Sequence, residues 1–164
     1  MGSGTDSCPD PFFTTVLPAP SHSLCGGADN WEVRPAVLIV EDTDSCNAAL
    51  SIAIQGFLGL DVQSAGNGVD GWRCLDEDNG TNIRAVLTDL HMPGMDGYGL
   101  LARIRSDRRF HGLPVIVISG TTDPSAPEGV IAAGADAYFE KPYSPATVRA
   151  KLERLLYEKH QLPS

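Results

Sequence analysis

The sequence predicts an α/β fold: a doubly wound, five-stranded parallel sheet of the flavodoxin-like (βα)5 type, with strand order 2-1-3-4-5. Five short predicted strands, most of them apolar, alternate along the chain with segments whose apolar residues recur at helical spacing. Short runs that are largely apolar are typical of parallel strands covered by helices on both faces. Because crossovers between parallel strands are right-handed, few topologies remain, and the flavodoxin-like order is the leading one.

Each predicted strand is short and lies between polar or turn-forming residues. The first, Ala36 to Val40, is rich in β-branched residues and fits a fully buried strand. The fourth carries Pro114 at its entry, where a missing backbone donor is tolerated. The predicted strands cover residues 36–40, 61–65, 84–88, 113–118 and 135–139.

A helix is predicted after each strand. Thr43 or Asp44 can cap the first helix, and the second is weakened by its glycines. The third is expected to present Tyr98, Leu101 and Ile104 on one side. The second, third and fourth predicted helices cover residues 67–75, 96–105 and 128–133. Ser144 is expected to cap the fifth helix.

Four arginines gather near the end of the third predicted helix. Cations are favoured at a helix C-terminus, so we interpret the cluster as a solvated helix end. Its members are Arg103, Arg105, Arg108 and Arg109.

The predicted elements divide the chain into one domain with two flanking segments. A length of 164 residues favours a single domain. Residues 1–34 are rich in Pro and Gly and are predicted to be an irregular N-terminal extension. The domain itself is predicted over residues 35–158, and residues 159–164 form a C-terminal tail.

Composition excludes several classes of function. Twelve Lys and Arg face 21 Asp and Glu, a net charge of −9, which argues against direct nucleic-acid binding and against docking on an anionic membrane. No apolar run approaches the roughly 20 residues of a membrane-spanning helix. The first 33 residues lack Lys and Arg and do not resemble a secretory signal. The four cysteines show no CxxC spacing, so we expect free thiols in a reducing compartment, the cytoplasm.

Acidic, hydroxyl and amine side chains follow four of the predicted strands. They are Glu41 and Asp42, Asp89, Ser119 and Lys141. In a doubly wound sheet, ligands bind beyond the carboxyl ends of the strands, so these side chains are expected to converge. Clustered carboxylates repel unless a cation neutralises them, and Mg²⁺ is the usual cation where phosphate is present. A lysine suits a phosphate oxygen, and a carboxylate can be the nucleophile that forms an aspartyl-phosphate.

These residues stand within motifs that resemble those of a known family. The motifs are Glu41-Asp42, Thr88-Asp-Leu-His-Met-Pro-Gly-Met-Asp-Gly97, Val-Ile-Ser119-Gly and Tyr138-Phe-Glu-Lys141-Pro142. Together they resemble response-regulator receiver domains of two-component signal transduction, the CheY-like superfamily. The resemblance runs from about Ala36 to about Leu156, and the order and spacing of its motifs make chance agreement improbable.

The resemblance implies a phosphorylation site with a metal beside it. Asp89 matches the phosphoacceptor and also a ligand of Mg²⁺. Asp42 matches the direct Mg²⁺ ligand, and Glu41 matches its acidic neighbour, which acts through water. The backbone carbonyl of His91 matches the remaining protein ligand, and its side chain either flanks the phosphoryl group or has no role.

The resemblance also implies a lysine and two switch residues. Lys141 matches the lysine that pairs with Asp89 and then with the phosphoryl group, and its peptide bond to Pro142 is expected to be cis. Ser119 matches the hydroxyl that binds a phosphoryl oxygen. Tyr138 matches the aromatic switch residue, although an aromatic residue in a strand is also a common packing residue.

The implied function is a switch rather than an enzyme. A sensor histidine kinase or a histidine phosphotransfer protein would supply the phosphoryl group to Asp89, and the altered shape would regulate a partner. Dimerisation of the protein through the face of the fourth helix, fifth strand and fifth helix is a further expectation.

Two alternatives stay open at this point. A pseudo-receiver would use the same face only for binding, but the complete set of acids, hydroxyl and lysine argues against it. An enzyme of this fold would be an FMN binder or an aspartyl-phosphate phosphatase. An FMN binder would be yellow on purification, and the phosphatase normally has an Asp-x-Asp motif that Glu41-Asp42 does not supply.

Overall fold

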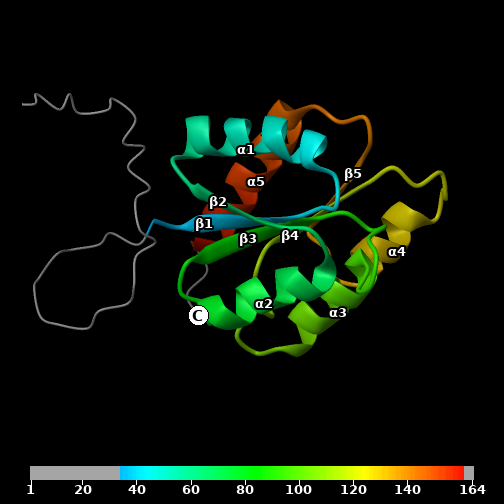
Figure 1. Cartoon of the computed structure of the whole chain (residues 1–164), viewed down its shortest axis with the longest axis horizontal. Coiled ribbons are helices and arrows are strands. Elements are labelled where there is room, and N and C mark those ends of the chain that lie inside the picture. Colours follow the sequence, from blue (N-terminus) through cyan, green and yellow to red (C-terminus); the bar gives the residue numbers. More distant parts are fainter. Residues whose placement is uncertain (1–33, 161–164) are drawn as a thin grey trace, which may run out of the picture. The chain divides into compact units, whose positions relative to one another are not determined.

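The computed structural model of the protein describes the backbone of residues 34–160 and the side chains of all these residues except 44–47, 57 and 160. It confirms the predicted fold class. Five parallel strands form one sheet in the order β2-β1-β3-β4-β5, with a helix after each strand (Figure 1). The predicted extension, apart from Arg34, and most of the predicted tail lie outside the described residues.

The strands lie where the apolar runs predict them, within two residues at each end. Pro114 precedes the fourth strand and contributes only its carbonyl, which accepts from the backbone N–H of Val86 at 2.9 Å. The fifth strand begins two residues later than predicted, because the N–H of Ala135 bonds back to Val130. The strands are β1 (Ala36–Val40), β2 (Asp61–Ala65), β3 (Ile83–Thr88), β4 (Val115–Ser119) and β5 (Ala137–Glu140).

Two of the helices begin at residues whose side chains satisfy one of the first backbone N–H groups. The Asn67 side chain accepts from the N–H of Asp70, and the Asp96 side chain accepts from that of Gly99. Thr43 stands at the N-cap of the first helix, as predicted, but makes no side-chain capping bond. The helices are α1 (Asp44–Leu58), α2 (Gly68–Asp78), α3 (Gly97–Ser106), α4 (Ala126–Ala132) and α5 (Pro145–His160).

The helices form two layers around the sheet. α1 and α5 cover one face, and α2, α3 and α4 cover the other (Figure 1). Alternate residues of the central strands point to opposite layers, so each face has its own apolar cluster. The cluster beneath α1 and α5 includes Val37, Ile39, Leu50, Ile54, Leu87, Ile116, Val148 and Leu152. The cluster above α2, α3 and α4 includes Leu38, Val40, Leu75, Val86, Leu101, Ile104, Val117 and Val130.

Two expectations for α3 are wrong in part. Tyr98 does not share the buried side of Leu101 and Ile104; it is 38% exposed, whereas they are fully buried. The arginine cluster is not simply a solvated helix end either. Arg105 is half-buried and donates to the carbonyl oxygens of Gly134 and Leu113, both at 2.8 Å.

The guanidinium of Arg105 joins two loops and a strand end. Besides Gly134 and Leu113, it donates to the carbonyl of His111 at 3.1 Å and to the carboxylate of Asp136 at 3.0 Å. Asp136 also accepts from the backbone N–H of Val115 at 2.8 Å. Because a guanidinium carries five donors in a planar fork, it can satisfy several backbone carbonyls together. We call this set of contacts the Arg105 clamp.

Among the described residues, none of the helices is long and apolar enough to cross a lipid bilayer. Cys74 is a free cysteine, and the other three cysteines of the chain lie outside the described side chains.

Candidate functional site

The carboxyl ends of the strands bring the predicted polar residues to one edge of the sheet. The N–H of Asp89 donates to the carbonyl of Val40 at 3.0 Å, which aligns the ends of β1 and β3. The N–H of Lys141 donates to the carbonyl of Ser119 at 2.8 Å, which aligns the ends of β4 and β5. Register in a parallel sheet therefore juxtaposes residues that lie up to 100 positions apart in the chain.

Lys141 forms the centre of the site. Its Nζ lies 2.7 Å from Oδ2 of Asp89 and 2.6 Å from Oε1 of Glu41. Both carboxylates are buried, Glu41 at 8% and Asp89 at 9% exposed. Burial alone lowers the pKa of Lys141, but the hydrogen bonds to Asp89 and Glu41 raise that pKa above its ordinary value. The ammonium is thus charged at neutral pH and offsets part of the repulsion between the two carboxylates.

Asp89 is held by its own backbone surroundings. Its Oδ1 accepts from the backbone N–H of His91 at 3.0 Å, while its Oδ2 accepts from Lys141. Gly97 opens α3 directly against this backbone: a Cβ there would collide with the carbonyl oxygen of Asp89 and lie 2.9 Å from the Cα of Leu90. The sequence analysis did not single out Gly97, although it stands inside the quoted motif.

The loop after β4 carries the predicted hydroxyl. Ser119 is fully buried, and its Oγ accepts from the backbone N–H of Thr121 at 3.3 Å. The next residue, Gly120, has the Lys141 stem as its neighbour, because a Cβ there would lie 3.8 Å from Lys141 Cβ. Ser119 and Lys141 therefore occupy adjacent ends of β4 and β5.

Tyr138 lies on β5 and faces the layer that contains α4. It is half-buried and packs against the apolar cluster on that side of the sheet. Burial and then the negative charge of Glu140 raise the pKa of its hydroxyl. Tyr98 extends toward the same region, because a Cβ on Gly129 of α4 would lie 3.3 Å from the Tyr98 hydroxyl.

The predicted metal ligands are only partly gathered. Asp42 is exposed, and its carboxylate accepts from the Thr43 hydroxyl at 3.2 Å. The His91 side chain is exposed, and its backbone N–H points to Asp89. Within residues 34–160 as described, no three His, Cys, Asp or Glu side chains are arranged to hold a metal ion.

The chemistry of the donors nevertheless fits a hard divalent cation. Glu41, Asp42 and Asp89 carry three negative charges against the single positive charge of Lys141, which leaves two in excess. Carboxylate and carbonyl oxygens are the donors that Mg²⁺ prefers. The peptide bond between Lys141 and Pro142 is cis, as expected.

Comparison with known proteins identifies the family. The response regulator receiver domain family matches residues 37–153. Chemotaxis protein CheY1 of Helicobacter pylori is 34% identical over 122 residues, which cover 73% of this chain and 95% of that protein. The DNA-binding response regulator MtrA of Mycobacterium leprae is 32% identical over 126 residues, 74% of this chain and 53% of that protein. The chain belongs to the response regulator receiver family.

Solved structures agree with the fold. The signal receiver domain of a signal transduction histidine kinase from Syntrophus aciditrophicus superposes with a TM-score of 0.70 at 26% identity, covering 79% of this chain and 96% of that one. A CheY-like receiver domain protein from Methanospirillum hungatei gives 0.64 at 26% identity, covering 78% and 98%. These receivers are named for a chemotaxis protein, a DNA-binding regulator and a kinase, so family membership alone does not indicate the output of this chain.

Proposed function

We propose that the protein is a phosphoacceptor receiver that takes a phosphoryl group on Asp89 and changes conformation to regulate a partner. The observation that carries the proposal is the ammonium of Lys141, 2.7 Å from Asp89 and 2.6 Å from Glu41 at the carboxyl edge of the sheet. A charged lysine beside a buried carboxylate fits a site that must bind a phosphate dianion. The family supports a signalling role, with a histidine kinase or phosphotransfer protein as the donor.

The proposed reaction is an exchange of one bond for another. A carboxylate oxygen of Asp89 attacks the phosphorus of a phosphohistidine on the donor, and an acyl-phosphate P–O bond forms. The P–N bond breaks, and its electron pair stays on the imidazole, which takes a proton from water. Positioning and electrostatic stabilisation carry most of the catalysis in phosphoryl transfer.

Two side chains of the chain itself would stabilise the transferred group. Lys141 would keep one donor on Glu41 and turn another from the Asp89 carboxylate to a phosphoryl oxygen, because an ammonium has three donors. Ser119 would donate its hydroxyl to a second phosphoryl oxygen. Its Oγ, which accepts from the N–H of Thr121, can keep that contact, because a hydroxyl donates and accepts at the same time.

Mg²⁺ is the proposed cofactor. Asp42, Asp89 and the backbone carbonyl of His91 would hold it, and Glu41 would contribute through water. When bound, the ion neutralises the charge of the phosphoryl oxygens.

The proposed output is a change on the face that contains Tyr138. Movement of Ser119 toward the phosphoryl group would free space in the loop after β4, and Tyr138 would turn into it. Phosphorylation would shift a population between two conformations. The face formed by α4, β5 and α5 is the proposed surface for a regulated partner or a second copy.

Intact-mass measurement tests the proposal. The protein is incubated with acetyl phosphate and Mg²⁺, together with the variants Asp89→Ala and Asp61→Ala. Asp61 is a suitable control because it is an exposed aspartate at the start of β2. We expect one phosphoryl adduct on the wild type and on Asp61→Ala, and none on Asp89→Ala. An undiminished adduct on Asp89→Ala, or no adduct on the wild type, would overturn the proposal.

A further inference from the structure

The central strand of the sheet contains an arginine that interrupts its buried pattern. β3 lies in the middle of the five strands, and all its residues except Arg84 are buried. Strands covered on both faces are normally apolar throughout, so a charged residue at this position needs a physical explanation.

A β-bulge explains how the sheet accommodates Arg84. Ala36 of β1 pairs with Ile83, and the next residue, Val37, pairs with Ala85, so Arg84 is the extra residue without a partner on β1. Ile83 and Val86 consequently lie in the same apolar cluster although they are three positions apart. Bulges are rare between parallel strands, and they re-aim a side chain. Here the bulge leaves the Arg84 side chain exposed.

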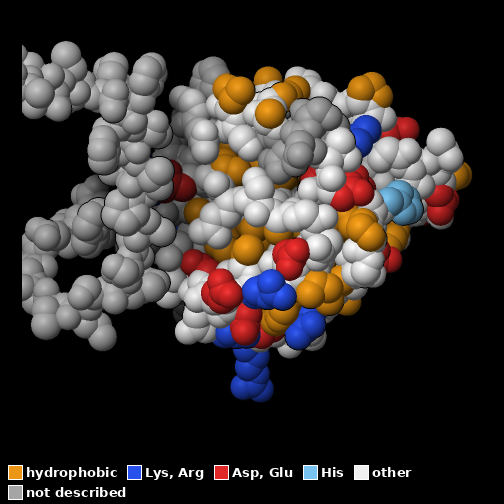
Figure 2. Space-filling model, in the orientation of Figure 1, with side chains coloured by type: hydrophobic (Ala, Val, Ile, Leu, Met, Phe, Trp, Pro, Cys, Tyr) orange, Lys and Arg blue, Asp and Glu red, His pale blue; other side chains and the backbone are white. Residues whose placement is uncertain are grey.

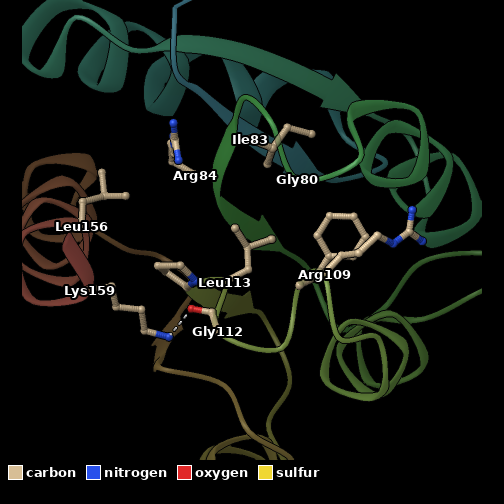
Figure 3. Close-up of a pocket in the computed structure, with 10 residues that line it drawn as sticks. Gly80, Ile83, Arg84, Arg109, Gly112, Leu113, Leu156 and Lys159 are labelled. Carbon is tan, nitrogen blue, oxygen red and sulfur yellow. Dashed lines mark hydrogen bonds between the residues drawn. The ribbon is translucent and has the colours of Figure 1, made fainter. Parts of the chain in front are cut away.

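Arg84 lines a pocket at the amino end of the sheet. The pocket has a volume of about 380 Å³, within the range of sites for small molecules. Leu113 and Leu156 supply the exposed apolar surface, because Ile83 and Phe110 are only 3% and 2% exposed. Figure 3 shows Leu156 and Lys159 on α5, at one side of the pocket. Asp89 follows the carboxyl end of β3, so the pocket and the phosphoacceptor site lie at opposite ends of that strand.

One side of the pocket carries an excess of positive charge. Lys159 and Arg105 share a single carboxylate, that of Asp136, at 3.1 and 3.0 Å. No hydrogen bond or ion pair joins the side chain of Arg84 to any other residue that the structure describes. Arg109, on the other side, is already paired with Asp76 and Asp107. In a chain of net charge −9, a pocket lined by one unpaired arginine and by a lysine that shares its carboxylate with another cation is a distinct feature.

We propose that this pocket binds a small organic anion, a carboxylate with an apolar body. The anion would bind the fork of Arg84 in a bidentate manner, because the guanidinium matches the carboxylate in shape and charge. Lys159 would contribute its remaining donor, since two are used by Gly112 and Asp136. The apolar body would lie against Leu113 and Leu156. The pocket and the proposed phosphorylation site share no residue, so naphthoate binding can be tested on the unphosphorylated protein.

Nuclear magnetic resonance titration with naphthoate tests the proposal. We expect saturable shifts confined to backbone amides around the pocket, such as those of Ile83, Arg84, Gly112 and Leu113. Naphthylmethanol, which lacks the charge, and acetate, which lacks the apolar body, should each bind at least about tenfold more weakly, as expected for loss of one charge-assisted contact or of the buried rings.

Variants at two arginines provide the matched comparison. Arg84→Gln should weaken naphthoate binding roughly tenfold, because it removes a charge-assisted bidentate contact. Arg108→Gln removes an exposed arginine that does not line the pocket and should leave the affinity unchanged. Equal affinities for the two variants, equal binding of naphthylmethanol, or shifts spread over the surface would each refute the proposal.

Discussion

Lys141 is the residue on which the charge balance of the candidate site depends. Among the side chains that the structure describes, it is the single cation in contact with the buried carboxylates Glu41 and Asp89, which come from the ends of two neighbouring strands. Removing one partner of a buried ion pair is more costly than the pair is stabilising, because it leaves charge without compensation.

We therefore expect Lys141→Met to destabilise the fold by about 1–3 kcal/mol. Methionine keeps most of the aliphatic stem, so the decrease in the free energy of unfolding reports the removal of the charge rather than a loss of packing. Urea unfolding at neutral pH measures this decrease. Lys151→Met on α5 is the control, because Lys151 contacts neither carboxylate. If the two variants unfold at the same urea concentration, the charge balance described above is wrong.

The raised pKa of Lys141 also determines how its contribution to the stability of the fold depends on pH. The pKa of Lys141 is raised in the folded protein, so its contribution is fully present below its ordinary value of 10.5. The contribution is lost as the pH rises through the raised pKa. The difference in stability between the wild type and Lys141→Met should accordingly stay constant near neutral pH and shrink only in strong alkali.

At the scale of elements, α1 presents an apolar surface beside the site. Ile52 is 70% exposed, and Ala49, one turn earlier, lines an open hollow with Lys141, Pro142 and Tyr143. Figure 2 shows hydrophobic side chains on the outer side of α1. A protein that delivers a phosphoryl group to Asp89 must dock near Lys141, and this surface offers it apolar contacts.

Ile52→Asp should slow phosphotransfer from a phosphohistidine protein about tenfold, because the charge would have to be desolvated at the interface. Phosphorylation by acetyl phosphate should be unaffected, since that donor needs no docking surface. The time course of adduct formation with each donor measures the effect. Val69→Asp changes an exposed apolar residue on α2, in the opposite layer, and serves as control. Equal slowing with both donors would indicate damage to the site instead of the interface.

Some elements of this fold could be predicted from the sequence, and others could not. The strands and the convergence of Lys141 and Asp89 at one edge of the sheet could be predicted, because they depend on local pattern and on parallel register. The pairing of these two residues was implied by the resemblance to receiver domains, and the structure shows it. The bulge at Arg84 could not be predicted, because it results from the pairing of β3 with β1 and leaves no pattern in the neighbouring sequence. The role of Arg105 could not be predicted either, because three of its four acceptors are backbone carbonyls, whose positions no side-chain pattern encodes.

For the whole molecule, the structure suggests where a change at Asp89 would travel. α4 has only seven residues, and its N-cap, Ser125, makes no side-chain capping bond. The segment before it is largely exposed, whereas Gly134, two residues beyond its last residue, is bound by Arg105. Elements with few anchoring contacts open most readily, so α4 is the element expected to respond.

Hydrogen exchange followed by mass spectrometry can test this expectation. With acetyl phosphate and Mg²⁺ present, protection should change in residues 120–132 and stay constant in α2. The Asp89→Ala variant under the same conditions should show neither change. A phosphorylated protein with unaltered exchange over residues 120–132, or with altered exchange throughout, would contradict the proposed route.

The Arg105 clamp determines which of the positions around it tolerate substitution. Its contacts at His111 and Leu113 are made through carbonyl oxygens, which every amino acid provides, so the clamp itself places no demand on those two side chains. Gly134 is different, because its φ of 104° and the nearby Arg105 stem leave little room for a Cβ. Relatives can thus vary at 111 and 113 while the arginine and the glycine persist together, an interdependence invisible to comparison of single positions.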